Sequence, residues 1–158
     1  MNIRKTLLFA AIISVTLFAC SKSSSSSASA QAMLTTNRWQ MSDATVTIPG
    51  TSITVDVYDS IPACIKDNFY TFATDGTATI DEGATKCDDT SPQTVSGNWK
   101  LLNNNTQLQT IDPLSQQEAT LTVASISSST LRLQDTATYN YMGSNIKVNA
   151  TVTLTNVK

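Results

Sequence analysis

The side chains that could do chemistry are limited in this chain, because its 158 residues include no histidine. Histidine is the usual general base near neutral pH, a member of serine and cysteine catalytic triads, and a common metal ligand. The 10 basic and 12 acidic side chains nearly balance, so the chain lacks the basic footprint of a nucleic-acid-binding protein. These features argue against an enzyme, a cofactor and nucleic acid as a partner.

Four acidic side chains lie close together in the sequence, Asp81, Glu82, Asp88 and Asp89. A pair of carboxylates can hydrolyse a glycosidic bond, and a cluster of carboxylate oxygens can bind Ca²⁺. The spacing is not that of an EF-hand loop, and the sequence indicates no cleft with aromatic platforms for a sugar. We therefore expect a solvent-exposed acidic loop, with no catalytic residue and no metal site.

Residues 1–19 have the order of an export signal. Two basic residues, Arg4 and Lys5, are followed by the apolar run Leu7–Phe18 and then by the small residue Ala19. The apolar run has 12 residues. A bilayer-spanning helix needs about 20 residues. The segment is therefore predicted to be a signal peptide and not a membrane span.

The end of this signal, Leu17-Phe18-Ala19-Cys20, resembles the lipobox of bacterial lipoproteins. The resemblance implies cleavage after residue 19 and acylation of Cys20, and several acyl chains on one residue would anchor the chain stably in a membrane. Ser21 follows the cysteine and no acidic run comes next, which by the same resemblance implies the periplasmic face of the outer membrane. The alternative is a plain secreted protein with a free Cys20 thiol.

Residues 20–32 are predicted to be the lipidated cysteine and a flexible tether. Ser21–Ala32 contains only Ser and Ala apart from Lys22 and Gln31, and it has no apolar period. A flexible coil of that length reaches about 20 Å, so the folded domain, predicted to be residues 33–158, would lie just off the membrane. Loss of the signal removes two of the 10 basic residues and none of the 12 acids, which leaves a net charge of −4.

From residue 33 onward, apolar and polar residues alternate, as is typical of strands with one buried face. The clearest run extends from Ile146 to Leu154, and turn dipeptides such as Asp75-Gly76 separate shorter runs. Because short connections favour antiparallel neighbours and closure removes exposed edges, we predict an all-β fold, a single antiparallel up-and-down β-barrel of about eight or nine strands. A two-sheet β-sandwich is the alternative. The expected strands are 38–47, 53–58, 69–73, 77–81, 95–102, 107–111, 118–126, 130–141 and 146–156.

Cys64 and Cys87 are the cysteines that remain if Cys20 is acylated, and an oxidising compartment favours a disulfide between them. The bond would stabilise the fold by about 3 kcal/mol by restricting the unfolded chain. Two separate buried thiols are the alternative. A structural zinc site is disfavoured, because such a site needs four ligands and the chain has no histidine.

A set of motifs across residues 34–158 resembles the lipocalin-like domain of Bacteroidetes envelope lipoproteins. The most specific pair is Cys64-Ile65-Lys66-Asp67-Asn68 together with Glu82-Gly83-Ala84-Thr85-Lys86-Cys87. The other matching elements are Leu34–Trp39, Tyr70-Thr71-Phe72, Asp75-Gly76-Thr77, Pro92, Gly97-Asn98-Trp99, Leu121, Leu131 and Leu133. The resemblance implies a lipobox, a Ser-rich tether and a small lipocalin-like barrel, but it implies no defined biochemical activity.

Four aromatic side chains fall within these motifs, Trp39, Tyr70, Phe72 and Trp99. In a small barrel such side chains can plug the interior or line a pocket for one small ligand. Our first interpretation is a lipid-anchored binding protein that holds a small apolar or amphipathic ligand at these residues, without covalent chemistry. The alternative is a filled barrel whose loops dock another envelope protein or a polysaccharide.

Overall fold

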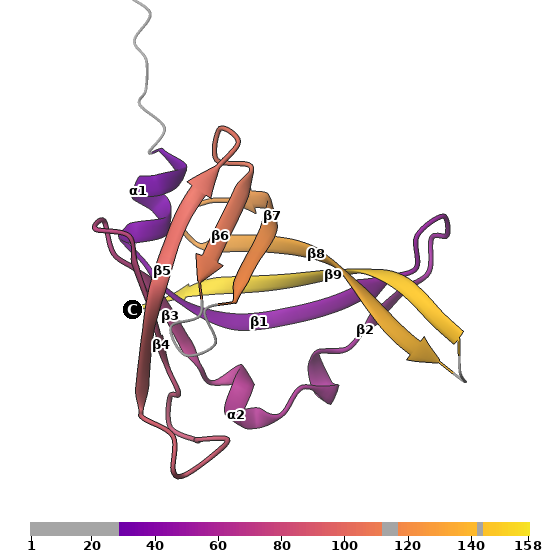
Figure 1. Ribbon diagram of the computed structural model, residues 1–158, viewed down its shortest axis with the longest axis horizontal. Coiled ribbons are helices and arrows are strands. Elements are labelled where there is room, and N and C mark those ends of the chain that lie inside the picture. The colour runs from indigo at the N-terminus through magenta and orange to yellow at the C-terminus, as the bar shows by residue number, and fades with distance from the viewer. Residues whose placement is uncertain (1–28, 112–116, 142–143) are drawn as a thin grey trace, which may run out of the picture.

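The computed structural model describes residues 29–111, 117–141 and 144–158 (Figure 1). The export signal, Cys20 and most of the predicted tether lie outside these residues, so their predictions stand as made. Strands dominate the described part of the chain, and nine of them form one sheet.

The strands occur close to their predicted positions. They are β1 (Arg38–Thr47), β2 (Thr54–Asp56), β3 (Phe69–Phe72), β4 (Thr77–Asp81), β5 (Thr94–Leu102), β6 (Gln107–Ile111), β7 (Glu118–Ile126), β8 (Thr130–Tyr141) and β9 (Ser144–Val157). The helical segments of the described chain are α1 (Ala30–Thr35), the 3₁₀ helix η1 (Tyr58–Ser60) and α2 (Ala63–Lys66). None of these helices is long and apolar enough to cross a membrane.

Closure of the sheet depends on β1, which pairs along both of its edges. One edge pairs with β9, from Arg38 opposite Val157 to Thr47 opposite Asn149. The other edge pairs with β3 at its start and with β2 at its end. The remaining neighbours follow chain order from β3 to β9, so eight strands close an antiparallel barrel and β2 is an extra strand. The predicted lipocalin-like, up-and-down barrel is confirmed, and the two-sheet sandwich is excluded.

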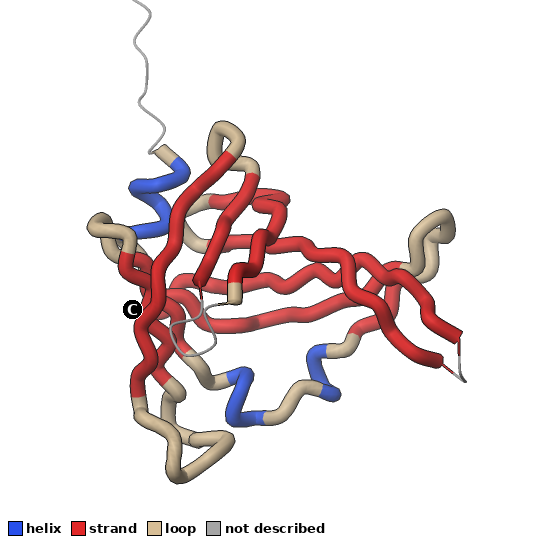
Figure 2. The backbone as a smooth tube through the Cα atoms, in the orientation of Figure 1, coloured by secondary structure: helices blue, strands red, loops and turns tan. Residues whose placement is uncertain are grey.

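β2 is shorter than predicted because the chain turns at Asp56. The Asp56 Oδ1 atom accepts a hydrogen bond of 2.9 Å from the N–H of Tyr58. This local bond replaces the pairing that an extended strand would need. The chain then forms η1 and α2, which the sequence analysis did not predict, and Figure 2 shows both helices on the segment that leads to β3.

Helix α1 covers one end of the barrel, which we call the closed end (Figure 1). The Ser29 Oγ atom caps this helix by accepting a hydrogen bond of 3.1 Å from the N–H of Ala32. Leu34 in the helix is 1% exposed, and its carbonyl accepts a 3.1 Å hydrogen bond from Nε1 of the fully buried Trp39. Helix α1 thus begins at Ala30, within the predicted tether, and Leu34 packs this helix against the barrel.

The closed end is filled by large apolar side chains from α1 and from most of the barrel strands. Two tryptophans and several leucines supply most of the volume, and Phe72 meets Trp99 edge to face with ring centroids 5.5 Å apart. The buried cluster consists of Leu34, Trp39, Phe72, Trp99, Leu108, Leu131, Leu133 and Leu154.

We expect Leu34→Ala to lower the free energy of unfolding by about 2–5 kcal/mol, because it removes a fully buried side chain from this cluster. Val55→Ala is the control, since Val55 is 51% exposed on β2. The control should change stability by less than about 0.5 kcal/mol. Urea unfolding of both variants checks the expectation, and equal effects would show that α1 is not part of the folded core.

Candidate ligand cavity

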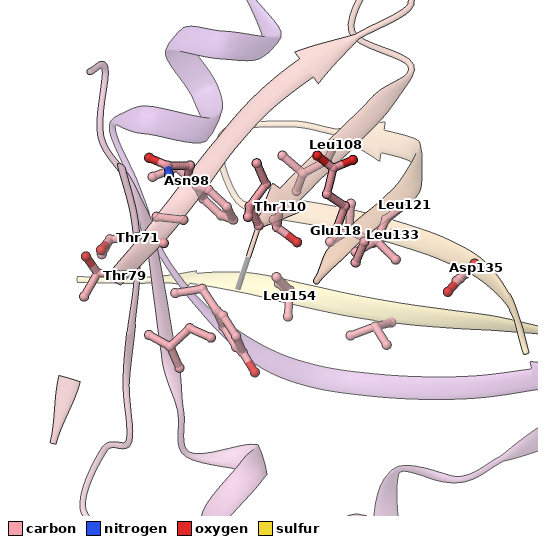
Figure 3. A pocket seen from close by; sticks show the side chains of 18 of the residues that line it. Thr71, Thr79, Asn98, Leu108, Thr110, Glu118, Leu121, Leu133, Asp135 and Leu154 are labelled. Atoms are coloured by element: carbon pink, nitrogen blue, oxygen red, sulfur yellow. The ribbon is translucent and has the colours of Figure 1, made fainter. Parts of the chain in front are cut away.

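A cavity of about 620 Å³ lies inside the barrel, beside the closed end (Figure 3). Residues of all eight barrel strands border it, and apolar side chains make up most of its wall. They include Met41, Tyr70, Phe72, Leu108, Leu121 and Leu133. The barrel is therefore packed at one end and hollow beyond it.

The room inside the barrel comes from small residues at inward positions of the sheet. Ala78 of β4 lies opposite both Phe72 of β3 and Gly97 of β5. Ala150 of β9 lies opposite Asp135 of β8. All of these residues border the cavity. A row of large side chains at the same positions would fill the space, as they do at the closed end.

Ile80 marks the side on which the cavity is open. It lies opposite Tyr70 in the β3–β4 pair and borders the cavity, yet it is 40% exposed. An isoleucine on the inner face of a filled barrel would be buried. This exposure shows that solvent reaches the cavity near the end of β4.

The charged side chains that border the cavity are both acidic within the described residues. They are Glu118 and Asp135, and no lysine or arginine accompanies them. Asp135 shares the inner face of β8 with the buried Leu131 and Leu133, because alternate residues of a strand face the same side. Figure 3 shows Asp135 farther along β8 than Leu133, away from the leucines.

Glu118 lies at the start of β7, on the rim of the cavity. Its Oε2 atom accepts a hydrogen bond of 3.2 Å from Nε2 of Gln109 on the neighbouring strand β6. Alternation from the cavity-facing Leu121 and Ala119 places the Glu118 side chain on the other face of the sheet. Glu118 and Asp135 therefore do not form a facing pair of carboxylates.

Tyr70 supplies a hydroxyl group at the cavity wall. Burial raises the pKa of Tyr70, and a hydrogen bond with the side chain of Asn68 offsets part of this effect. The phenol therefore stays protonated and uncharged across the physiological pH range. It can offer a hydrogen bond to a polar part of a ligand.

The four aromatic residues predicted to bind a ligand fall into two pairs. Tyr70 and Phe72 border the cavity. Trp39 and Trp99 are buried toward the closed end, where the Trp99 Nε1 atom donates a 3.0 Å hydrogen bond to the carbonyl of Ala73. Trp99 supports the cavity through its contact with Phe72. The small inward residues Ala78 and Gly97 were not predicted as part of the site, although their place in the alternation of β4 and β5 could have indicated space.

The predicted disulfide between Cys64 and Cys87 is present. It joins the segment of α2 to the loop between β4 and β5. The same two segments also meet where the N–H of Thr85 donates a 2.8 Å hydrogen bond to Oδ2 of Asp67. The disulfide and this hydrogen bond thus hold the β4–β5 loop against the segment that precedes β3.

The acidic residues of the β4–β5 region serve local structure. The pKa of Asp81 is lowered, first by a hydrogen bond from Gln93 and then by one from the N–H of Gly83. Arg38 adds a salt bridge of 3.2 Å to the same carboxylate. Thr90 likewise lowers the pKa of Asp88. Within the described residues, no group of three acidic or cysteine side chains could hold a metal ion.

No protein-family model matches the chain, and no curated protein matches it. Its function must therefore be inferred from the cavity and from the residues around it.

We expect Gly83→Ala to destabilise the protein more than Gly50→Ala, by about 1–3 kcal/mol. Both glycines have positive φ, 65° and 78°, so both variants carry a similar backbone strain. A Cβ atom at position 83 would also collide with the carbonyl of Asp67, whereas one at position 50 meets open space. Thermal unfolding measures the difference, and equal melting temperatures would contradict the close contact between the two segments.

Proposed function

We propose that this protein binds a small, largely apolar or amphipathic molecule in the barrel, without covalent chemistry. The observation that carries the proposal is the cavity of about 620 Å³ inside a closed barrel. Ligand sites in proteins usually enclose about 300–1,000 Å³ and have mostly apolar walls. A barrel whose only purpose was to present loops would gain stability by filling this space.

The wall can supply useful affinity because it is mostly apolar. Each 100 Å² of apolar surface removed from water contributes roughly 2.5 kcal/mol. The exposed part of Ile80 and the walls formed by Leu121 and Leu133 would be covered by such a ligand. The Tyr70 hydroxyl and the inward Thr110 add polar contacts for a ligand with one polar end. Affinity would come from this burial, and orientation would come from the polar groups.

The proposal includes no enzymatic step. The two carboxylates that border the cavity lie on opposite faces of the sheet, so they do not provide the paired acid and base of a hydrolase. Burial raises the pKa of Tyr70, so its phenol is already protonated at neutral pH and cannot act as a general base. Binding and release of an intact molecule is the function that this chemistry supports.

We also propose that the barrel is held at the outer membrane by acylated Cys20 and faces the periplasm. The sequence Leu17-Phe18-Ala19-Cys20 and the Ser-rich stretch after it support this proposal. Helix α1 begins at Ala30 and lies at the closed end, so a tether from Cys20 would join the barrel at that end. The solvent-accessible side of the cavity, at the end of β4, would remain free of the tether.

Docking of another envelope protein is a second candidate, because β8 and β9 project beyond the barrel. In the described residues, Asp135–Tyr141 of β8 pair with β9 and with no other strand. Figure 1 shows this pair as a long ribbon on one side of the molecule. A strand edge of this kind can accept a strand from another protein. The cavity favours the binding function, and the ribbon leaves a place for a partner.

We expect Val95→Trp to weaken ligand binding at least about tenfold, because Val95 borders the cavity and an indole would occupy its space. Ser96→Trp is the matched control, since Ser96 is the next residue of β5 and is exposed on the outer face. Thermal shift with decanol as the probe measures both variants, because a ligand that binds the folded state raises its melting temperature. Equal shifts in the two variants would place binding outside the barrel.

We expect Cys20→Ala to release the protein from membranes under a high-salt wash, while the parent protein requires detergent. The physical reason is the loss of the acyl chains that would anchor the chain. Fractionation followed by immunoblotting measures the distribution. If parent and variant fractionate alike, the lipobox interpretation is wrong.

A further inference from the structure

We propose that the cavity selects its ligand by the charge of the polar end, binding amphiphiles with a cationic or neutral end and rejecting those with a carboxylate. This inference rests on the proposed binding function and adds a ligand class to it. It starts from the composition of the wall, where Asp135 is the charged residue on the inner face and no lysine or arginine borders the cavity within the described residues.

Asp135 is the determinant of this selectivity because of its place in β8. It continues the inward row of Leu131 and Leu133, so its carboxylate stands where the apolar wall ends. Its cross-strand partner is Ala150, whose small side chain leaves space beside it. One carboxylate oxygen, Oδ1, accepts a hydrogen bond of 2.7 Å from the N–H of Thr136, which holds the side chain in position.

The basic residues of the barrel strands are on the outer face. Arg132 lies between the inward residues Leu131 and Leu133, and Lys100 lies between Trp99 and Leu101. Alternation along a strand therefore turns both cations away from the cavity. The salt bridge identified among the described side chains is that of Arg38 with Asp81, so neither Glu118 nor Asp135 is neutralised by an ion pair there.

These placements predict the charge of the ligand. An ammonium group at the end of the apolar wall would lie near the Asp135 carboxylate and be attracted to it. A carboxylate at the same depth would be repelled by Asp135, with no arginine or lysine of the wall to compensate. A neutral hydroxyl would be accepted, because the Tyr70 hydroxyl and the Asp135 carboxylate can both form hydrogen bonds with it.

The test compares decylammonium, decanol and decanoate, which share one alkyl chain and differ in the charge of the polar end. The chain beginning at Ser21 is used, because it keeps every described residue and removes the membrane into which the probes would partition. Tryptophan fluorescence titration gives the dissociation constant of each probe below its micelle concentration. We expect decylammonium and decanol to bind, and decanoate to bind at least about tenfold more weakly than decylammonium.

The variant Asp135→Asn should reduce the preference for decylammonium over decanoate to about threefold or less, with the decanol affinity unchanged. Asp75→Asn is the matched control, since it removes one negative charge from the turn between β3 and β4, near the closed end. This control should keep the preference. Added salt should weaken the preference in the parent protein, because the rim is accessible to solvent.

The outcomes separate the two proposals. If decanol fails to bind, the proposed binding function is wrong. If decanol binds and decanoate binds as well as decylammonium, the cavity is a ligand site but its charge selection is overturned. If the Asp135→Asn variant keeps the preference, or the Asp75→Asn control loses it, the preference arises from the overall negative charge of the protein and not from Asp135.

Discussion

The hydrogen-bonded seam between β1 and β9 is the interaction on which the rest of the structure depends. It joins the first strand of the barrel to the last, from Arg38 opposite Val157 to Thr47 opposite Asn149. Without it, both strands would be open edges, and the inner face of the sheet would be accessible to water. Once the barrel is closed, alternate side chains of each strand point into its interior, and the side chains between them point to solvent. Every later feature, including the buried tryptophans and the cavity, follows from that division.

Residue size then divides the interior into a filled part and a hollow part. Trp39, Trp99 and Leu34 occupy the closed end, where the two indole N–H groups donate to backbone carbonyls. Nearer the open side, Ala78 and Gly97 leave space that no neighbouring side chain fills. The packed side chains of the closed end can make the barrel rigid, and the cavity beside them has room for a ligand. A protein of this size can hold a cavity because its closed end supplies a compact core.

The sequence predicts the sheet well, because the signal for each strand is local. The alternation between Ile146 and Leu154 needs no knowledge of the partner strand, and β9 is found there. Helix α1 was not predicted, because its first residues resemble the Ser- and Ala-rich stretch before them. Its helical state depends on the burial of Leu34 against Trp39, which is a tertiary contact.

The candidate site was less predictable than the fold. Aromatic residues were expected to line a pocket, and the sequence could not distinguish those that support it, Trp39 and Trp99, from those that border it, Tyr70 and Phe72. That distinction depends on depth along the barrel axis, which is set by strand register and tilt. The sequence shows Asp135 as an acidic residue that continues the alternation of Leu131 and Leu133. Its role in selecting a ligand can be proposed only once the cavity beside it is known.

The central claim is that the hollow half of the barrel holds a molecule in the cell. Native mass spectrometry of the protein purified from its own cells tests this most directly. The account predicts a population with one additional small mass that is lost as an intact molecule on collisional activation and that is missing from the Val95→Trp protein. A single species at the mass of the mature, acylated chain, without a bound molecule in repeated preparations, would contradict it.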